Sequence, residues 1–264
     1  MIYILLGMHK SGTTMLSEIL HKSRINMGTF DEVKGYDQGN KYERLETHDL
    51  NIEMLGCSYK EHSLNIVHVL NDIRQLSPEI TGKMKQFVEK TDRQYQDWGF
   101  KDPRTCLTYS VWKEVLPRHK IIAILRHPSE LWTHYKNQKP LQVLQFFLTG
   151  WKALHAWYVY NDEILKILKA SDHHPYLLVN YDHFIEGGWA FDKLCDFAGR
   201  PLKDCRNSKL YRSKKKPNFL LSFTLWSQKT FLSRDVMGLY EKLKQYAALL
   251  IWLTLGAQIL SDLL

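Results

Sequence analysis

The start of the chain combines a buried strand with a glycine-rich turn. Residues Ile2–Leu6 form an unbroken apolar run, and Gly7 ends it. Such a run is typical of a strand that is covered on both faces, as in a parallel sheet. The turn that follows contains a second glycine, Gly12, and ends in the hydroxyl residues Thr13 and Thr14. Because backbone N–H groups at the start of a helix bind anions, this segment predicts a phosphate-binding loop in an α/β fold.

The lysine of this turn stands at an unusual position. The Walker A loop of nucleoside triphosphatases has the pattern Gly-x4-Gly-Lys-Ser/Thr. Gly7 and Gly12 keep that spacing, but Thr13 occupies the place of the lysine, and Lys10 lies inside the loop. The displaced lysine argues against a kinase-like site, as does the lack of an apolar strand that ends in a Walker B-type aspartate. A plain glycine turn with a solvated lysine is the simpler interpretation.

The rest of the chain is predicted to alternate between strands and helices. Apolar runs predict strands at 98–101, 120–125 and 176–180, and periodic patterns predict helices at 13–22, 42–55, 78–95, 105–116, from Pro128, at 140–170 and at 189–198. A loop is predicted over 26–42. We therefore expect a central parallel sheet with flanking helices. No repeat or linker divides the sequence, so we expect one domain over 1–264, with a helical C-terminal part at about 217–264.

The net charge of +8 suits an anionic ligand. A positive net charge would also attract nucleic acid. The sequence has no arginine-rich helix, zinc-finger spacing or stacking motif, so we expect no nucleic-acid partner. The four cysteines show no paired spacing, which predicts reduced thiols and a cytoplasmic protein. The histidines show no metal-ligand spacing, so no metal site is expected. No secretory segment is expected at the start of the chain.

The segment Tyr246–Leu255 is almost wholly apolar but too short to span a bilayer. A buried or subunit-contacting helix is the favoured interpretation, and a membrane-surface segment is the alternative. Whether the chain forms a homo-oligomer stays open.

Three further motifs follow predicted strands. Arg126, His127 and Pro128 follow the strand at 120–125, and an arginine there points into the ligand crevice of a parallel sheet. A simpler role for Arg126 is a strand-capping pair with Glu130. The motif Lys101-Asp102-Pro103-Arg104 ends another strand, either as a salt-bridged turn or with a direct role at the site. The motif Val179-Asn180-Tyr181-Asp182 ends the last strand.

Together these motifs resemble the sulfotransferase family, and most closely its stand-alone bacterial members. The loop Lys10-Ser11-Gly12-Thr13-Thr14 is similar to the family loop that binds the 5′-phosphosulfate of 3′-phosphoadenosine 5′-phosphosulfate (PAPS). The resemblance implies a P-loop sulfotransferase architecture and transfer of a sulfuryl group from PAPS to a hydroxyl or amine. Adenosine 3′,5′-bisphosphate would be the product, the acceptor would be a small molecule or a glycan, and no metal would be needed.

The resemblance also implies roles for individual residues. Lys10 would stabilise the leaving phosphate, and the donor would be held by His9, Lys10, Ser11, Gly12, Thr13 and Thr14. Arg126 would bind the 3′-phosphate. The family has a serine eight residues after this arginine, whereas this chain has His134 there, preceded by Thr133, and either could replace the serine. Arg212 and Lys214 are further candidates for the 3′-phosphate, although the run Lys214–Lys216 also fits a solvated face.

The transfer needs a base for the acceptor. In the bacterial members a Gly-Tyr segment leads to a glutamate at the start of a helix, and Gly35, Tyr36 and Glu43 correspond loosely to it. A carboxylate in a partly desolvated crevice can take a proton near neutral pH. His48 is the rival, since histidine titrates in that range without tuning. Both would lie on one predicted helix, on different faces.

Two other function classes remain as alternatives. One is a kinase-like phosphotransferase built on the same strand, loop and helix. The other is a non-catalytic nucleotide-binding module.

Overall fold

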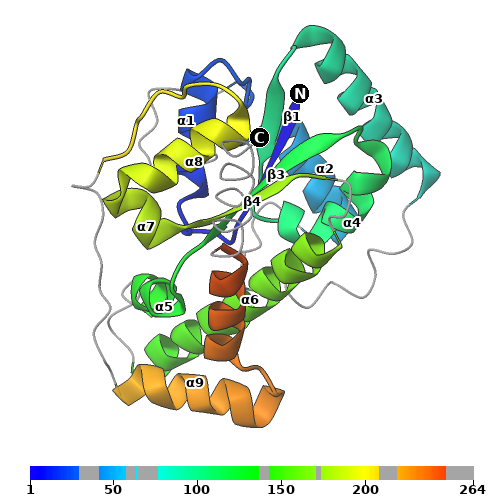
Figure 1. Ribbon diagram of the computed structural model, residues 1–264. Coiled ribbons are helices and arrows are strands. Elements are labelled where there is room, and N and C mark those ends of the chain that lie inside the picture. Colours follow the sequence, from blue (N-terminus) through cyan, green and yellow to red (C-terminus); the bar gives the residue numbers. More distant parts are fainter. Residues whose placement is uncertain are drawn as a thin grey trace.

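The computed structural model describes residues 1–29, 42–57, 64, 77–136, 143–170, 174–207 and 219–247. Within them, one parallel sheet has the strand order β2-β1-β3-β4 (Figure 1). The strands are β1 (Ile2–Leu6), β2 (Trp98–Lys101), β3 (His119–Leu125) and β4 (Tyr176–Asn180). Every residue of β1 is buried, as expected for a strand with neighbours on both sides and helices over both faces.

Helices connect the strands and cover the sheet. Between β1 and β2 lie α1 (Thr13–Lys22), α2 (Leu45–Leu55) and α3 (Pro78–Gln94); α4 (Thr105–Val115) leads to β3, and α5 (Pro128–Lys136) and α6 (Val143–Lys169) lead to β4. They are followed by α7 (Tyr181–Glu186), α8 (Gly188–Ala198), α9 (Phe219–Leu232) and a helical stretch at 236–247. Among the described residues, no helix is both long and apolar enough to cross a membrane.

The alternation of side chains along β1 divides the core into two halves. Ile2, Ile4 and Leu6 pack with residues of α2, α3, α4 and α6. Tyr3 and Leu5 point to the opposite face, where α1, α7 and α8 supply their partners. Figure 1 shows the same division, with α1, α7 and α8 on one side of the sheet. Each face of the strands is therefore covered, which explains their almost continuous apolar sequences.

The strand order places the expected ligand crevice at the carboxyl ends of β1 and β3. The chain leaves β1 toward β2 on one side and leaves β3 toward β4 on the other. Ligands of parallel α/β sheets bind where neighbouring strands send their connections in opposite directions. The glycine-rich loop follows β1 and Arg126 follows β3, so two of the motifs singled out in the sequence lie at this point.

The parallel α/β architecture that the sequence predicts is confirmed, with one difference near the crevice. The sequence pattern predicts a helix from Tyr42, but α2 begins at Leu45. Arg44 is held in an extended backbone conformation, and its guanidinium donates hydrogen bonds to the carbonyl oxygen and side chain of Asn26. The helix therefore starts late, and the prediction that Glu43 lies on it is wrong.

Helix α7 follows β4 without an intervening loop and is absent from the sequence prediction. Asn180 both ends β4 and caps α7, because its side-chain oxygen accepts hydrogen bonds from the N–H groups of Asp182 and His183. The helical segments α9 and 236–247 fall in the part predicted to be helical. Residues 30–41 of the predicted loop and 248–255 of the apolar C-terminal segment lie outside the described residues.

His119 at the start of β3 is buried as a neutral imidazole. Its Nδ1 lies 2.7 Å from the carbonyl oxygen of Pro117, and its Nε2 lies 2.7 Å from the hydroxyl oxygen of Tyr109. Nδ1–H therefore donates to the carbonyl, and Nε2 accepts from the hydroxyl. Burial is the main reason why the pKa of His119 is lowered to about 4. In the unfolded chain the pKa of histidine is about 6.5, so the unfolded state binds more protons between these two values.

We expect the free energy of unfolding to decrease as the pH falls from about 6.5 toward 4, with up to about 3 kcal/mol lost through His119. Urea unfolding at a series of pH values measures this loss. His119→Gln should flatten the pH dependence in this window, and His183→Gln, at an exposed histidine, is the control. An unchanged slope in His119→Gln would contradict the assignment.

Candidate functional site

The loop between β1 and α1 has the backbone of a phosphate cradle. Lys10 and Gly12 both have positive φ angles, 65° and 99°. The N–H of Ser11 donates to the carbonyl oxygen of Met8 at 3.2 Å and turns the chain back on itself. A Cβ atom at Gly12 would lie 2.5 Å from the ring of Tyr181. Glycine is therefore required at position 12 both by its φ angle and by the space available.

Helix α1 begins at the end of this loop without a side-chain cap. Gly12 is the N-cap, no side chain of its own caps the helix, and no acidic residue lies in the first turn. The first N–H groups of a helix have no partners within it and carry the positive end of the helix dipole. Ser11 and Thr13 are buried, whereas Thr14 is partly exposed. This arrangement suits a phosphate group.

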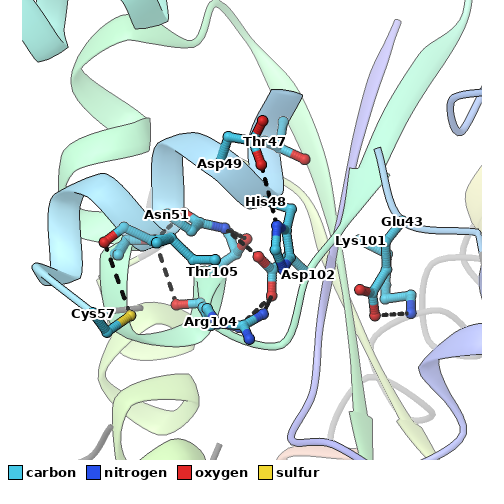
Figure 2. Close-up of polar contacts among 12 residues, drawn as sticks. Glu43, Thr47, His48, Asp49, Asn51, Cys57, Lys101, Asp102, Arg104 and Thr105 are labelled. Atoms are coloured by element: carbon cyan, nitrogen blue, oxygen red, sulfur yellow. Dashed lines mark hydrogen bonds and ion pairs between the residues drawn. The ribbon is translucent and has the colours of Figure 1, made fainter. Parts of the chain in front are cut away.

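Lys101 and Glu43 form an ion pair beside the loop (Figure 2). The distance from Lys101 Nζ to Glu43 Oε1 is 2.5 Å, and the two side chains are 3% and 11% exposed. Lys101 Nζ also lies 3.5 Å from Thr14 Oγ1. Lys101 ends β2, the neighbour of β1, and Glu43 comes directly before the N-cap of α2. Two segments distant in sequence thus bring a lysine and a carboxylate to the start of α1.

The motif that begins with Lys101 divides into two parts in the structure. Asp102 accepts hydrogen bonds from Asn51 Nδ2 at 3.1 Å and from the backbone N–H and Nη1 of Arg104 at 2.9 and 3.1 Å. Figure 2 shows this cluster apart from the facing pair of Lys101 and Glu43. Asp102 and Arg104 thus form a salt-bridged turn, whereas Lys101 reaches the loop. The interpretation as a salt-bridged turn is confirmed for Asp102 and Arg104, and a direct role of Lys101 at the site stays a prediction.

His48, the second candidate base, lies on α2 and is almost completely buried. It is 3% exposed, and its Nδ1 lies 3.3 Å from Asp49 Oδ1. His9, at the other side of the site, lies in the loop with its ring edge-on to Tyr160, at a centroid distance of 6.3 Å. Of the two candidate bases, Glu43 is linked to the loop through Lys101 and Thr14.

Arg126 connects the end of β3 to the loop. Its Nη1 donates to the carbonyl oxygen of Lys10 at 2.7 Å, and its Nε donates to Glu130 Oε2 at 2.7 Å. The carbon atom of its guanidinium lies 4.3 Å from the centre of the Tyr181 ring. The pair with Glu130 that the simpler interpretation expects is therefore present. It does not remove Arg126 from the crevice, because the same side chain contacts the loop.

The other candidates for contact with the 3′-phosphate lie on α5 or outside the described residues. Thr133 and His134 both lie on α5; the Thr133 hydroxyl donates to the carbonyl oxygen of Ser129 at 2.8 Å, and His134 is exposed. Arg212 and Lys214 lie outside the described residues, as do Gly35 and Tyr36.

Two residues at the site were not assigned a role from the sequence. The ring of Tyr181 packs against Gly12 and Arg126, and burial is the main reason why its pKa is raised. Cys106 on α4 accepts a hydrogen bond through Sγ from the N–H of Gly7 at 3.2 Å, and its burial raises the pKa of the thiol. The sequence signal for Tyr181 is its place directly after β4. No pattern in the sequence around Cys106 indicates that its thiol contacts the loop.

In the part of the chain that the structure describes, no three or more histidine, cysteine or acidic side chains are grouped closely enough to hold a metal ion.

The chain is similar in structure to the sulfotransferase domain from the Synechococcus PCC 7002 olefin synthase, with 16% identity, a TM-score of 0.51, and coverage of 92% of this chain and 94% of that one. It is also similar to the sulfotransferase domain from the curacin biosynthetic pathway, with 15% identity, a TM-score of 0.49, and coverage of 85% and 82%. At such identities the likeness concerns the fold. No curated protein sequence matches the chain.

A sequence model described as "Sulfotransferase family" matches residues 3–204. The match contains the loop after β1, the ion pair of Glu43 and Lys101, and Arg126. It covers most of the chain, and the parallel α/β fold agrees with it. The chain belongs to the sulfotransferase family.

Proposed function

We propose that the protein transfers a sulfuryl group from PAPS to a hydroxyl or amine of a small-molecule or glycan acceptor. One observation carries the proposal: basic residues lie at the carboxyl ends of three neighbouring strands. Lys10 follows β1, Lys101 ends β2 and Arg126 follows β3. Cations arranged in this way suit a donor that carries anionic groups at two positions.

The donor would lie across the crevice with its 5′ end at the loop. The residues that would hold this end are His9, Lys10, Ser11, Gly12, Thr13 and Thr14. Arg126 would bind the 3′-phosphate, with Thr133 or His134 as the second contact and Arg212 and Lys214 as further candidates. The positive φ angles of Lys10 and Gly12, and the N-terminus of α1 without a side-chain cap, support the first part of this placement.

In the reaction, the acceptor oxygen or nitrogen forms a bond to sulfur while the bond between sulfur and the oxygen of the 5′-phosphate breaks. Charge builds on that oxygen, and Lys10 would stabilise it. The acceptor proton would pass to Glu43, which Lys101 holds in place through the 2.5 Å ion pair. His48 remains the rival base. A sulfuryl group carries less charge than a terminal phosphoryl group, so lysine and backbone donors would suffice without Mg²⁺.

A thermal-shift panel tests the proposal with adenosine 3′,5′-bisphosphate, ATP and GTP, each with and without Mg²⁺. At a concentration of about 100 Kd, the bisphosphate should stabilise the protein by about 2.7 kcal/mol, and EDTA should not change this shift. Stabilisation by ATP or GTP that needs Mg²⁺ would favour the kinase-like phosphotransferase instead. Bisphosphate binding without release of sulfate from PAPS would favour the non-catalytic module.

The role of Arg126 can be tested with two nucleotides. Arg126→Ala should weaken adenosine 3′,5′-bisphosphate by about ten- to a hundredfold, because a charge-assisted contact is worth about 1.5–3 kcal/mol. Adenosine 5′-phosphate lacks the 3′-phosphate and should lose much less affinity in calorimetric titration. Since this variant leaves the buried Glu130 without its cation, Arg126→Ala/Glu130→Gln is measured as well. Equal losses for both nucleotides in both variants would mean that Arg126 only supports the loop.

The same two nucleotides distinguish the candidates for the second contact. If Thr133 replaces the family serine, Thr133→Val should selectively weaken the bisphosphate. If His134 does so, His134→Ala should have this effect and Thr133→Val should not.

A further inference from the structure

The backbone of Arg126 is held by a side chain from α6. Strand β3 ends at Leu125 and α5 begins at Pro128, so Arg126 belongs to neither element. The indole Nε1–H of Trp157 donates a hydrogen bond to the carbonyl oxygen of Arg126 at 3.0 Å. Trp157 is fully buried in the core on that face of the sheet. Breaking a buried hydrogen bond of this kind is costly, because the carbonyl group loses its partner without gaining water.

Tyr240 packs against this tryptophan from the helical stretch at 236–247, and it is itself buried. Figure 1 shows this stretch running from α9 toward the sheet. The ring centroid of Tyr240 lies 6.3 Å from that of Trp157 and 4.7 Å from that of His127. His127 Nδ1 in turn lies 2.6 Å from the hydroxyl oxygen of Ser129, near the start of α5. Tyr240 thus contacts both the tryptophan and the residue that follows the arginine.

The position of this backbone determines what the Arg126 guanidinium can reach. Its Nη1 donates to the carbonyl oxygen of Lys10 at 2.7 Å, and its carbon atom lies 4.3 Å from the centre of the Tyr181 ring. A guanidinium binds a phosphate through N–H groups in a rigid, planar arrangement. A small shift of the backbone therefore misaligns more than one of these bonds at once.

We propose that Trp157 is a positioning residue for Arg126, supported by Tyr240, so that the helical stretch at 236–247 contributes to recognition of the 3′-phosphate. This inference rests on the proposed function, in which Arg126 binds that phosphate. The stretch lies outside residues 3–204, the part of the chain that matches the family model. Both aromatic residues act through the backbone of Arg126, without contact to the nucleotide.

Calorimetric titration of Trp157→Phe with two nucleotides tests this inference. Phenylalanine keeps an aromatic ring in the core but lacks the N–H group that binds the Arg126 carbonyl. Affinity for adenosine 3′,5′-bisphosphate should fall by about three- to tenfold, the usual effect of losing one hydrogen bond. Affinity for adenosine 5′-phosphate should change much less. A loss of stability alone would leave the ratio of the two affinities unchanged.

Trp98→Phe is the matched control. Trp98 is also fully buried, and its Nε1–H donates to Asp92 Oδ1 at 3.1 Å. It begins β2, so it lies at the opposite end of the strand from the expected crevice. Both variants should lower the free energy of unfolding, but only Trp157→Phe should change the ratio of affinities. Tyr240→Leu leaves the tryptophan in place and should change the ratio in the same direction, so it tests the contact even if Trp157→Phe fails to fold.

A double variant shows whether the tryptophan acts through the arginine. In the Arg126→Ala background, Trp157→Phe should cause no further loss of bisphosphate affinity, because residues that act as one unit have non-additive effects. An additive loss would overturn the inference. So would an equal change of the ratio in Trp98→Phe, or an unchanged ratio in both Trp157→Phe and Tyr240→Leu. These results leave the proposed function intact, whereas a parent chain that does not prefer the bisphosphate would overturn the proposed role of Arg126 and this inference with it.

Discussion

Replacing Lys10 with alanine is expected to lower kcat by about 10²–10³ while adenosine 3′,5′-bisphosphate still binds. The proposed bond of the Lys10 ammonium strengthens as charge develops on the leaving phosphate oxygen, and loss of one donor of this kind costs about that factor. Release of the bisphosphate from saturating PAPS, with water as the acceptor, measures the effect without knowledge of the natural acceptor. Normal turnover in Lys10→Ala would remove Lys10 from the mechanism.

Two further variants separate the ammonium group from the backbone of the loop. Lys10 has a φ of 65°, a conformation that costs a non-glycine residue about 1–2 kcal/mol. Lys10→Gly relieves this strain, whereas Lys10→Ala keeps it, yet both remove the amine. Similar losses in the two variants would assign the effect to the amine. Lys22→Ala, at an exposed lysine paired with Glu18 at the other end of α1, is the control and should leave turnover unchanged.

The fold could be predicted from the sequence where the burial of a single strand or helix determines its own pattern of apolar residues. The apolar runs of β1, β3 and β4 predict strands because both faces of these strands are covered. The boundaries of α2 could not be predicted in this way. Arg44 is polar and fits a helix, but its bonds to Asn26 hold the backbone extended, and that contact depends on segments distant in sequence.

The residues of the candidate site fall into the same two groups: those in local motifs, and those whose placement depends on distant segments. The loop after β1 and the arginine after β3 are local motifs, so the sequence could place both at the sheet edge. The ion pair of Lys101 with Glu43 depends on the late start of α2 and on the neighbouring positions of β1 and β2. The spacing of apolar residues within either segment does not indicate that Lys101 and Glu43 lie together.

Helix α9 shows a different limit of sequence analysis. Phe219, Phe223, Trp226 and Phe231 are exposed, although large apolar side chains of a surface helix are expected to face the core. Leu221 is buried in the core instead, and Gln228 donates to the carbonyl oxygen of Trp151 on α6. Which side of the helix faces water therefore depends on contacts between segments that are distant in sequence.

Glu43→Gln should lower turnover by about 10²–10⁴, because the amide keeps the size of the carboxylate and can still accept a hydrogen bond from Lys101 but cannot take the acceptor's proton. Nucleotide affinity should stay near that of the parent chain. Glu53→Gln is the matched control: Glu53 lies on α2 and pairs with Lys83 at 2.8 Å, but both side chains are exposed. If His48→Asn has the large effect and Glu43→Gln does not, His48 is the base.

A double variant with substitutions at Lys101 and Glu43 tests the role of Lys101. If Lys101 acts by holding the carboxylate in place, Lys101→Met should lower turnover alone but add little in the Glu43→Gln background. If its ammonium instead contacts the sulfuryl group or the leaving oxygen, the two losses should multiply. Residues that act as one unit show such non-additive losses, whereas independent contacts give additive changes in activation free energy. The 2.5 Å ion pair and the 3.5 Å distance to Thr14 favour the first result, because they direct Lys101 Nζ toward Glu43 at the start of α1.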